Sequence, residues 1–273
     1  MNAQPQPADR HWLHAYPPGV PAEIDPDAIP SLKHLFEQAC REHAARPAFS
    51  NMGRTLTYAQ MDELSRCFGA WLQHVAGLKK GDRVALMMPN ILQYPVAIIG
   101  ALRAGMTVVN VNPLYTPREL EHQLNDSGAA VIVIFENACA TLQQVLDATP
   151  VRRVIVTGIG DLLGFPKGAM TNYVIRRVKK MVPPWQIPGA LRFRDVLAQG
   201  AAHPLNPVDV RGTDVAFLQY TGGTTGVSKG AVLTHRNLVA NTEQVVAFMP
   251  ELKELQDAVV VTALPLYHIF ALT

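Results

Sequence analysis

The chain has 273 residues, of which 48% are hydrophobic and 17% charged, so it contains enough apolar side chains for one large domain or two smaller ones. A net charge of +2 is too small to indicate a nucleic-acid partner. No apolar stretch approaches the roughly 20 residues that span a bilayer, and the N-terminus lacks the pattern of a signal peptide. We therefore expect a soluble, cytoplasmic protein that is at most peripheral to the inner face of the cell membrane.

The cysteines and histidines give no sign of a metal site. Cys40, Cys67 and Cys139 are widely separated and show no CxxC spacing, which favours reduced thiols in the core. The chain has nine histidines but no HExxH pattern, so a zinc site is not expected.

Strands and helices alternate along the first two thirds of the chain. Residues 1–30 contain seven prolines and predict an extended surface arm. Helices are expected to begin at the capping residues Ser31, Thr57 and Thr116, with others over 90–104 and from about 136 to 148. Strands are expected at residues 48–49, 55–57, 83–87, 107–111, 131–135 and 154–156. This alternation predicts an α/β fold with mostly parallel sheets, covered by helices on both faces.

Residues 162–194 interrupt that alternation. They include seven basic residues and no acidic one. Within them, apolar residues recur at helical spacing from Val174 to Val182, and Pro183 follows. Two interpretations stay open: a helix packed in the core with a solvated basic face, or a basic amphipathic segment at 170–182 that contacts an anionic membrane.

Alternation resumes after residue 207. The pattern predicts a strand over 214–220, a short strand at 232–233, a helix over 235–249 and an apolar strand over 258–263. Between the first two strands stands the stretch YTGGTTGVSKGA, residues 220–231. Small residues after a strand leave backbone N–H groups accessible, and such groups bind phosphates. Lys229 adds a mobile positive charge.

Two named motifs can be tested against this loop. The Walker-type loop fails, because the residue five places after Gly222 or Gly223 is not the glycine that precedes a lysine. Residues 226–230 match G-x-S-x-G, the nucleophile elbow of α/β-hydrolases, with Asp257 and His268 as the other triad members. However, five loop-forming residues separate the strand from Gly226. A glycine-rich loop without a ligand is a further alternative.

The stretch 220–231 resembles the phosphate-binding signature of the AMP-forming acyl-CoA synthetases, an adenylating superfamily. Residues 102–129 and 260–273 are similar to two further blocks of that family. Together with GDRVALMMPNILQYPVA, they are most similar to bacterial long-chain fatty acid–CoA ligases of the β-oxidation type. Ser228 departs from the common proline, at a position that the family uses for backbone shape.

The resemblance implies a reaction in two steps. A long-chain fatty acid attacks the α-phosphate of ATP, which gives an acyl-adenylate and pyrophosphate, and the thiol of coenzyme A then displaces AMP. It implies that His268 and Lys229 are catalytic, with His268 near the acyl carboxylate, and that Thr221 contributes to a Mg²⁺ site. The nucleotide-binding residues that it implies are Tyr220, Thr221, Gly222, Gly223, Thr224, Thr225, Gly226 and Lys229.

The same resemblance implies a division of the chain. Residues 31–210 would form a first α/β subdomain, residues 211–273 would begin a second that carries the phosphate loop, and the family's C-terminal domain would be absent. Since the family's acidic magnesium ligand and adenylation lysine lie outside this sequence, we expect the chain by itself to be inactive.

Other functions stay open at this point. An adenylate-forming ligase for a different carboxylic acid would show the same loop. The hydrolase and a non-catalytic fragment that binds membranes belong to other classes. His268 could also be a histidine that packs between Tyr267 and Ile269.

Overall fold

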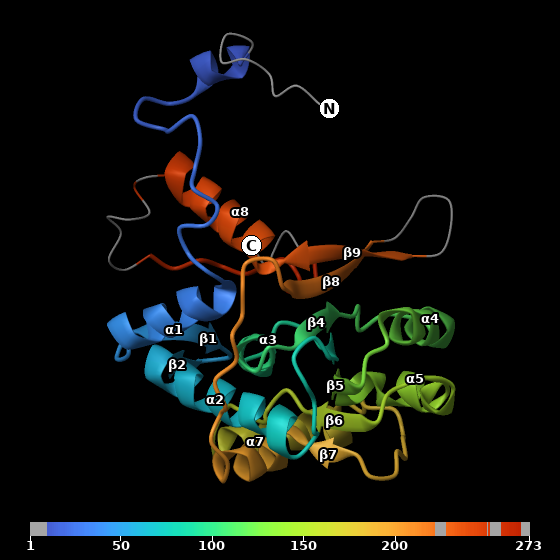
Figure 1. Ribbon diagram of the computed structural model, residues 1–273. Helices are drawn as coiled ribbons and strands as arrows, with labels where there is room; N and C mark the ends of the chain where they lie inside the picture. Colours follow the sequence, from blue (N-terminus) through green and yellow to red (C-terminus); the bar gives the residue numbers. More distant parts are fainter. Residues whose placement is uncertain (1–9, 222–227, 250, 252–257, 269–273) are drawn as a thin grey trace.

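The computed structural model describes residues 10–221, 228–249, 251 and 258–268. A seven-stranded sheet with the order β7-β6-β5-β3-β4-β8-β9 forms its centre (Figure 1). All neighbouring strands are parallel except β8 and β9, which confirms the predicted α/β class. The strands are β3 (Arg83–Met87), β4 (Thr107–Asn110), β5 (Val131–Phe135), β6 (Arg153–Thr157), β7 (Leu191–Arg192), β8 (Val215–Thr221) and β9 (Lys229–Thr234).

Helices cover both faces of the sheet, and the strands divide their side chains between the two layers (Figure 1). Along β3, Val84 and Leu86 belong to one apolar core, whereas Ala85 and Met87 belong to the other. Strands buried on both faces read as continuous apolar runs, as they do here. The first core is covered by α2 (Tyr58–His74), α3 (Gln93–Arg103) and α7 (Phe193–Ala201), and the second by α4 (Pro117–Ser127) and α5 (Cys139–Gln143).

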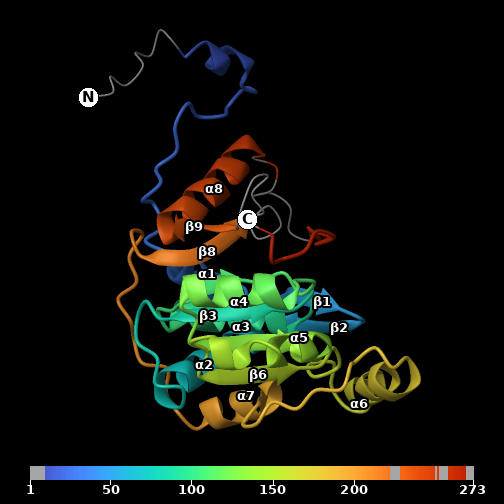
Figure 2. The same ribbon diagram turned by 90° about the vertical axis from the view of Figure 1, so that its right-hand side faces the viewer.

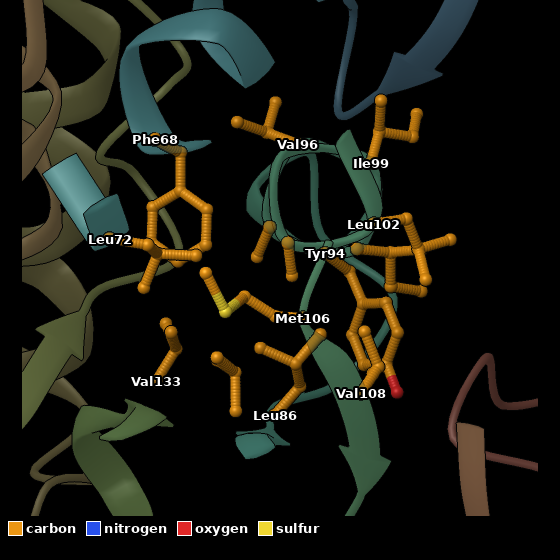
Figure 3. Close-up of a cluster of buried hydrophobic side chains, with 14 of the residues drawn as sticks. Phe68, Leu72, Leu86, Tyr94, Val96, Ile99, Leu102, Met106, Val108 and Val133 are labelled. Atoms are coloured by element: carbon orange, nitrogen blue, oxygen red, sulfur yellow. The ribbon is translucent and has the colours of Figure 1, made fainter. Parts of the chain in front are cut away.

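Close backbone contact joins α2 to α3 and requires two glycines. A Cβ added at Gly69 would lie 2.8 Å from the carbonyl oxygen of Gly100, and one added at Gly100 would lie 2.7 Å from that of Ser65. Around this contact, Phe68 and Leu72 of α2 lie on the same side of α3 as Met106 (Figure 3). The central helix α3 is buried along its whole length.

Helix caps explain where several elements begin. The side chains of Thr57 and Thr116 each accept a hydrogen bond from the backbone N–H three residues on. The side chains of Gln60 and Glu119 in turn accept from the backbone N–H of the two threonines, so both helices begin with a capping box. Ser31 caps α1 (Leu32–Glu42) by accepting a hydrogen bond from the backbone N–H of His34, without a capping box. The predicted starts of these three helices are confirmed.

Smaller elements frame the sheet. A separate antiparallel hairpin consists of β1 (Pro47–Asn51) and β2 (Arg54–Thr57). The described part of the N-terminal arm contains one turn of 3-10 helix, η2 (His11–Ala15), and otherwise no helix or strand before Ser31. Two 3-10 turns, η3 (Glu136–Ala138) and η4 (Leu146–Ala148), flank α5, which is shorter than the helix predicted to reach residue 148.

One strand predicted in the second half of the chain is absent, and another is longer than predicted. Residues 258–263 form no strand, and Val259, Val260 and Val261 are more than four-fifths exposed. An apolar run becomes a strand only where a neighbouring strand completes its hydrogen bonds, and no described strand lies beside this one. The predicted short strand at 232–233 is confirmed as part of β9, which is longer because it pairs with β8 along its whole length.

The structure contradicts one of the two interpretations of the basic segment at 162–194, the helix packed in the core. It forms α6 (Lys167–Tyr173) and a π-helical turn η5 (Val174–Val178), which project from the body of the molecule (Figure 2). Val174, Val178 and Met181 are exposed, so this stripe does not pack in the core.

The sheet also crosses the predicted boundary at residues 210 and 211. β8 pairs with β4 in parallel, and α8 (His235–Phe248) follows β9. The division of the chain into two subdomains stays a prediction.

Candidate nucleotide site

The predicted phosphate loop follows β8 at the side of the sheet where the parallel strands have their carboxyl ends. β3 pairs with β4 on one side and β5 on the other, so the connections diverge at this point of the sheet. In open α/β sheets, ligands bind outside the carboxyl ends of the strands, near such a point. β8 is parallel to β4, so Thr221 lies at the same edge.

The two flanks of the loop are held together by the β8–β9 ladder. Thr221 pairs with Lys229, and Tyr220 with Gly230. Thr221 and Lys229 are both exposed at the open end of this ladder. The predicted site residues Gly222, Gly223, Thr224, Thr225 and Gly226 lie outside the described residues.

This geometry contradicts the hydrolase alternative. A nucleophile elbow places its serine on a sharp turn between a strand and a helix. Ser228 instead precedes the antiparallel strand β9, and its carbonyl oxygen accepts a hydrogen bond from His122 Nε2 at 3.0 Å. The serine therefore lacks the strand-to-helix setting that the motif needs.

A chain of buried side chains connects the sheet to the segment that carries His268. Tyr94 donates to Asn110 Oδ1 at 2.8 Å, and Asn110 donates to Gln219 Oε1 at 3.0 Å. Gln219 then donates to the carbonyl oxygen of Tyr267 at 2.9 Å. This chain holds Tyr267, and with it the neighbouring His268, beside β8.

Asn90, which follows β3, fixes the same segment from the other side. Its amide donates to the carbonyl oxygens of Thr262 and Leu264 at 3.0 and 2.8 Å and accepts from the backbone N–H of Leu266 at 2.8 Å. His268 itself is exposed, and its backbone N–H donates to the carbonyl oxygen of Pro265. Ile269, the other neighbour in the packed alternative for His268, lies outside the described residues, so that alternative stays open.

Sequence reasoning missed these supporting residues. Asn90, Asn110 and Gln219 are polar residues at strand ends, and only their convergence in the fold reveals the network. His122 and Asp126 on α4, which contact the two flanks of the loop, carried no motif. Their spacing of four residues on one helix was the one available signal.

The described donors suit a polyphosphate better than a metal bound by protein alone. Lys229 offers a cation, and Thr221 offers a neutral hydroxyl beside it. Within the described ranges, no group of three His, Cys, Asp or Glu side chains could hold a metal ion. Mg²⁺ retains waters and phosphate oxygens in nucleotide sites, so a single hydroxyl from Thr221 is compatible with it.

Residues 36–273 match the family model described as AMP-binding enzyme. The chain belongs to this family. It is 58% identical over 262 residues to a long-chain-fatty-acid–CoA ligase of Salmonella typhimurium. That match covers 96% of this chain and 47% of the Salmonella protein. It is 48% identical over 269 residues to the protein of the same name in Haemophilus influenzae, which covers 97% of this chain and 48% of that one. The chain therefore spans about half the length of these curated relatives.

Solved structures share the fold. The apo structure of MbtA from Mycobacterium smegmatis has a TM-score of 0.71 at 25% identity and covers 98% of this chain and 44% of that chain. A long-chain-fatty-acid-CoA ligase from Archaeoglobus fulgidus has a TM-score of 0.67 at 24% identity and covers 94% of this chain and 46% of that chain.

Proposed function

We propose that this protein takes part in the ATP-dependent activation of a long-chain fatty acid, first to the acyl-adenylate and then to the acyl-CoA used in β-oxidation. The observation that supports this most is the pair Thr221 and Lys229, which flanks the sequence GGTTGVS at the carboxyl ends of the parallel strands. The family match and the names of the relatives favour the same reaction.

The physical difficulty of the first step is that two anions must meet. Lys229 would neutralise the β- and γ-phosphates and thereby withdraw charge from the α-phosphate that the carboxylate attacks. A Mg²⁺ ion bound with the nucleotide supplies further charge neutralisation, and Thr221 would be its ligand from this chain. His268 would lie near the acyl carboxylate, on the segment fixed by Asn90 and Gln219.

Because we expect the 273 residues by themselves to be inactive, the proposal is tested by an assay of a full-length protein that contains them, with palmitate, ATP, Mg²⁺ and CoA. The expected products are palmitoyl-CoA, AMP and pyrophosphate. Exchange of labelled pyrophosphate into ATP across a panel of carboxylic acids would separate a long-chain substrate from the alternative acids. If labelled pyrophosphate exchanges into ATP with another carboxylic acid but not with palmitate, the proposed long-chain substrate is wrong and that acid takes its place.

We also propose that the protein contacts an anionic membrane at the inner face of the cell membrane through residues 170–182, which include the end of α6 and all of η5, together with the preceding residues from Phe165. Phe165 is 92% exposed, and Met170, Tyr173 and Val178 are each more than 60% exposed. Exposed basic side chains accompany them, namely Lys167, Arg177, Lys179 and Lys180. In the described part of the chain, no helix has the length and apolar character needed to cross a bilayer, so any contact made by these helices would be peripheral.

Charge reversal tests this contact. Each basic residue near an anionic surface contributes about 1 kcal/mol, which salt screens. Changing Arg177, Lys179 and Lys180 to Glu should therefore weaken sedimentation with phosphatidylglycerol vesicles at low salt. The matched control changes Arg41, Arg118 and Arg152, which are exposed elsewhere, to Glu. Equal binding by both triple variants would refute a specific contact.

A further inference from the structure

One helix contacts both flanks of the predicted phosphate loop. Tyr220, before the loop, donates its hydroxyl hydrogen to Asp126 Oδ2. Ser228, after the loop, accepts a hydrogen bond at its carbonyl oxygen from His122 Nε2, 3.0 Å away. His122 and Asp126 are four residues apart on α4, so they lie on one face of that helix.

The protonation states of these groups follow from chemistry. A carbonyl oxygen only accepts, so His122 carries its proton on Nε2. Burial and the adjacent Asp126 carboxylate both raise the pKa of Tyr220, which therefore stays a phenol and donates. Both contacts thus have one donor and one acceptor.

Tyr220 also contacts the strand on the far side of the loop. Its ring lies across Gly230, where an added Cβ would lie 3.0 Å from ring atoms Cε2 and Cζ. Tyr220 is 8% exposed. The ring is therefore enclosed between β9 and α4, and its hydroxyl is directed to Asp126.

α4 is itself fixed to the sheet. Its capping box defines its start, and Gly128 in the left-handed conformation ends it. Leu120 and Leu124 are fully buried in the second core, and Gln123 donates to the carbonyl oxygen of Asn110 at 2.8 Å. A helix held at both ends and along one face can act as a rigid support.

We propose that His122 and Asp126 are positioning residues that fix the two ends of the phosphate loop relative to each other. His122 holds the peptide plane between Ser228 and Lys229, and therefore the direction in which the Lys229 side chain leaves the backbone. Asp126 holds Tyr220, the neighbour of Thr221. Fixing both ends before the nucleotide arrives lowers the entropy cost of binding it. This inference rests on the proposed function for its nucleotide, although the contacts themselves do not.

Steady-state kinetics of a full-length protein that contains this chain test the role. His122→Ala and Tyr220→Phe should each raise KM for ATP about three- to tenfold, the effect of one lost hydrogen bond, and leave KM for palmitate unchanged. His122→Gln keeps an N–H donor and should restore most of the loss. Arg118→Ala, an exposed residue on the same helix, is the matched control.

Amide hydrogen exchange supplies a readout that needs no activity. His122→Ala should speed exchange over residues 229–231, whereas Arg118→Ala should not. If the wild-type protein is active but His122→Ala changes neither KM for ATP nor exchange, the positioning role is refuted. A uniform fall of all kinetic constants together with the melting temperature would also refute it, since that shows only a structural role. If the wild-type protein uses no ATP, the proposed function fails. Faster exchange in His122→Ala would then still support the positioning of the loop ends by His122, and unchanged exchange would refute it.

Discussion

Arg176 forms an ion pair with Glu136, with 2.7 Å between Nε and Oε2. The glutamate side chain is 1% exposed and follows β5, whereas Arg176 belongs to the projecting turn η5. Glu136 Oε1 has no hydrogen-bond partner within the described part of the chain. The pair therefore ties the α6–η5 segment to the sheet, and Arg176 serves the interior rather than the basic surface around it.

Replacing Arg176 by Ala should destabilise the protein in a pH-dependent way. Burial raises the pKa of Glu136 above its ordinary 4.5, and Arg176 opposes that shift. A raised carboxyl pKa means that the folded state binds the proton more tightly, so stability is lost as pH rises from 4.5 through the folded pKa. Without Arg176 that loss grows, so we expect about 1–3 kcal/mol of destabilisation at neutral pH and less at about pH 4.5.

Urea unfolding at the two pH values measures this effect. The double variant Arg176→Ala with Glu136→Gln is the control, because it removes the buried charge and should recover part of the stability at neutral pH. An equal cost at both pH values would show that the Glu136 charge is not its origin.

A buried histidine makes a second contribution to pH dependence. Burial lowers the pKa of His235 from 6.5 to about 4, and its side chain is 1% exposed. The unfolded chain then binds the proton more tightly, so stability is complete above pH 6.5 and falls as pH decreases towards 4. We expect a loss of about 2 kcal/mol between about pH 7.5 and 5 from this residue.

Chemical denaturation of His235→Gln tests that contribution. The variant should show a smaller decrease in stability over this pH interval than the wild-type protein, whatever its stability at neutral pH. His14→Gln, an exposed site in the N-terminal arm, should leave the decrease unchanged. If the stability of His235→Gln decreases with pH as steeply as that of the wild-type protein, other groups cause the acid sensitivity.

Local sequence signals predicted much of the fold. The run Thr116-Pro117-Arg118-Glu119 contains a cap, a proline at the first helical position and the returning glutamate, and α4 begins there. The apolar run Val131–Phe135 is a central strand, as predicted. Such signals act within a few residues, so they can be recognised without the tertiary structure.

Features that depend on distant partners could not be predicted in this way. Helical periodicity in residues 174–182 indicated an apolar stripe, but it could not show whether that stripe faces the core or solvent. The contacts of α4 with the loop flanks join residues 94 and 106 positions apart. The apolar run at 258–263 resembles a strand by composition, whereas strand formation needs a neighbour that composition does not specify.

Gly230→Ala should disturb the site through Tyr220. Alanine in place of glycine usually stabilises by about 0.4–1 kcal/mol where the backbone permits it. Here the new Cβ would press on the Tyr220 ring, which Asp126 prevents from moving freely. We expect the strain to exceed the gain, with a net loss of about 0.5–2 kcal/mol.

A double-mutant cycle with Tyr220→Ala isolates that contact, using unfolding free energies. Once the ring is removed, Gly230→Ala should become neutral or stabilising. If its effect is the same in both backgrounds, the ring is not the cause.

The three thiols should react slowly in the native protein. Cys40, Cys67 and Cys139 are free and buried. Burial raises the pKa of Cys40 and Cys67 to about 11 and that of Cys139 to about 12, so little thiolate is present at neutral pH. A disulfide reagent such as DTNB should label all three rapidly in denaturant and none rapidly without it. Fast labelling of one thiol in the native protein would indicate local opening around it.

Lys229→Ala should impair use of ATP much more than binding of the fatty acid. Lys229 is exposed beside Thr221 at the open end of the β8–β9 ladder, and the proposed function assigns it to the phosphates of ATP. Loss of one charged contact that strengthens in the transition state should cost about 2–4 kcal/mol in adenylation, measured as kcat/KM for ATP in a full-length protein that contains this chain. Ser228→Ala is the matched neighbour, and it should be mild because Ser228 contributes its carbonyl oxygen, which alanine retains. If Ser228→Ala abolished turnover while Lys229→Ala did not, the serine hydroxyl would be the reacting group, and the assignment of this loop to phosphate binding would be wrong.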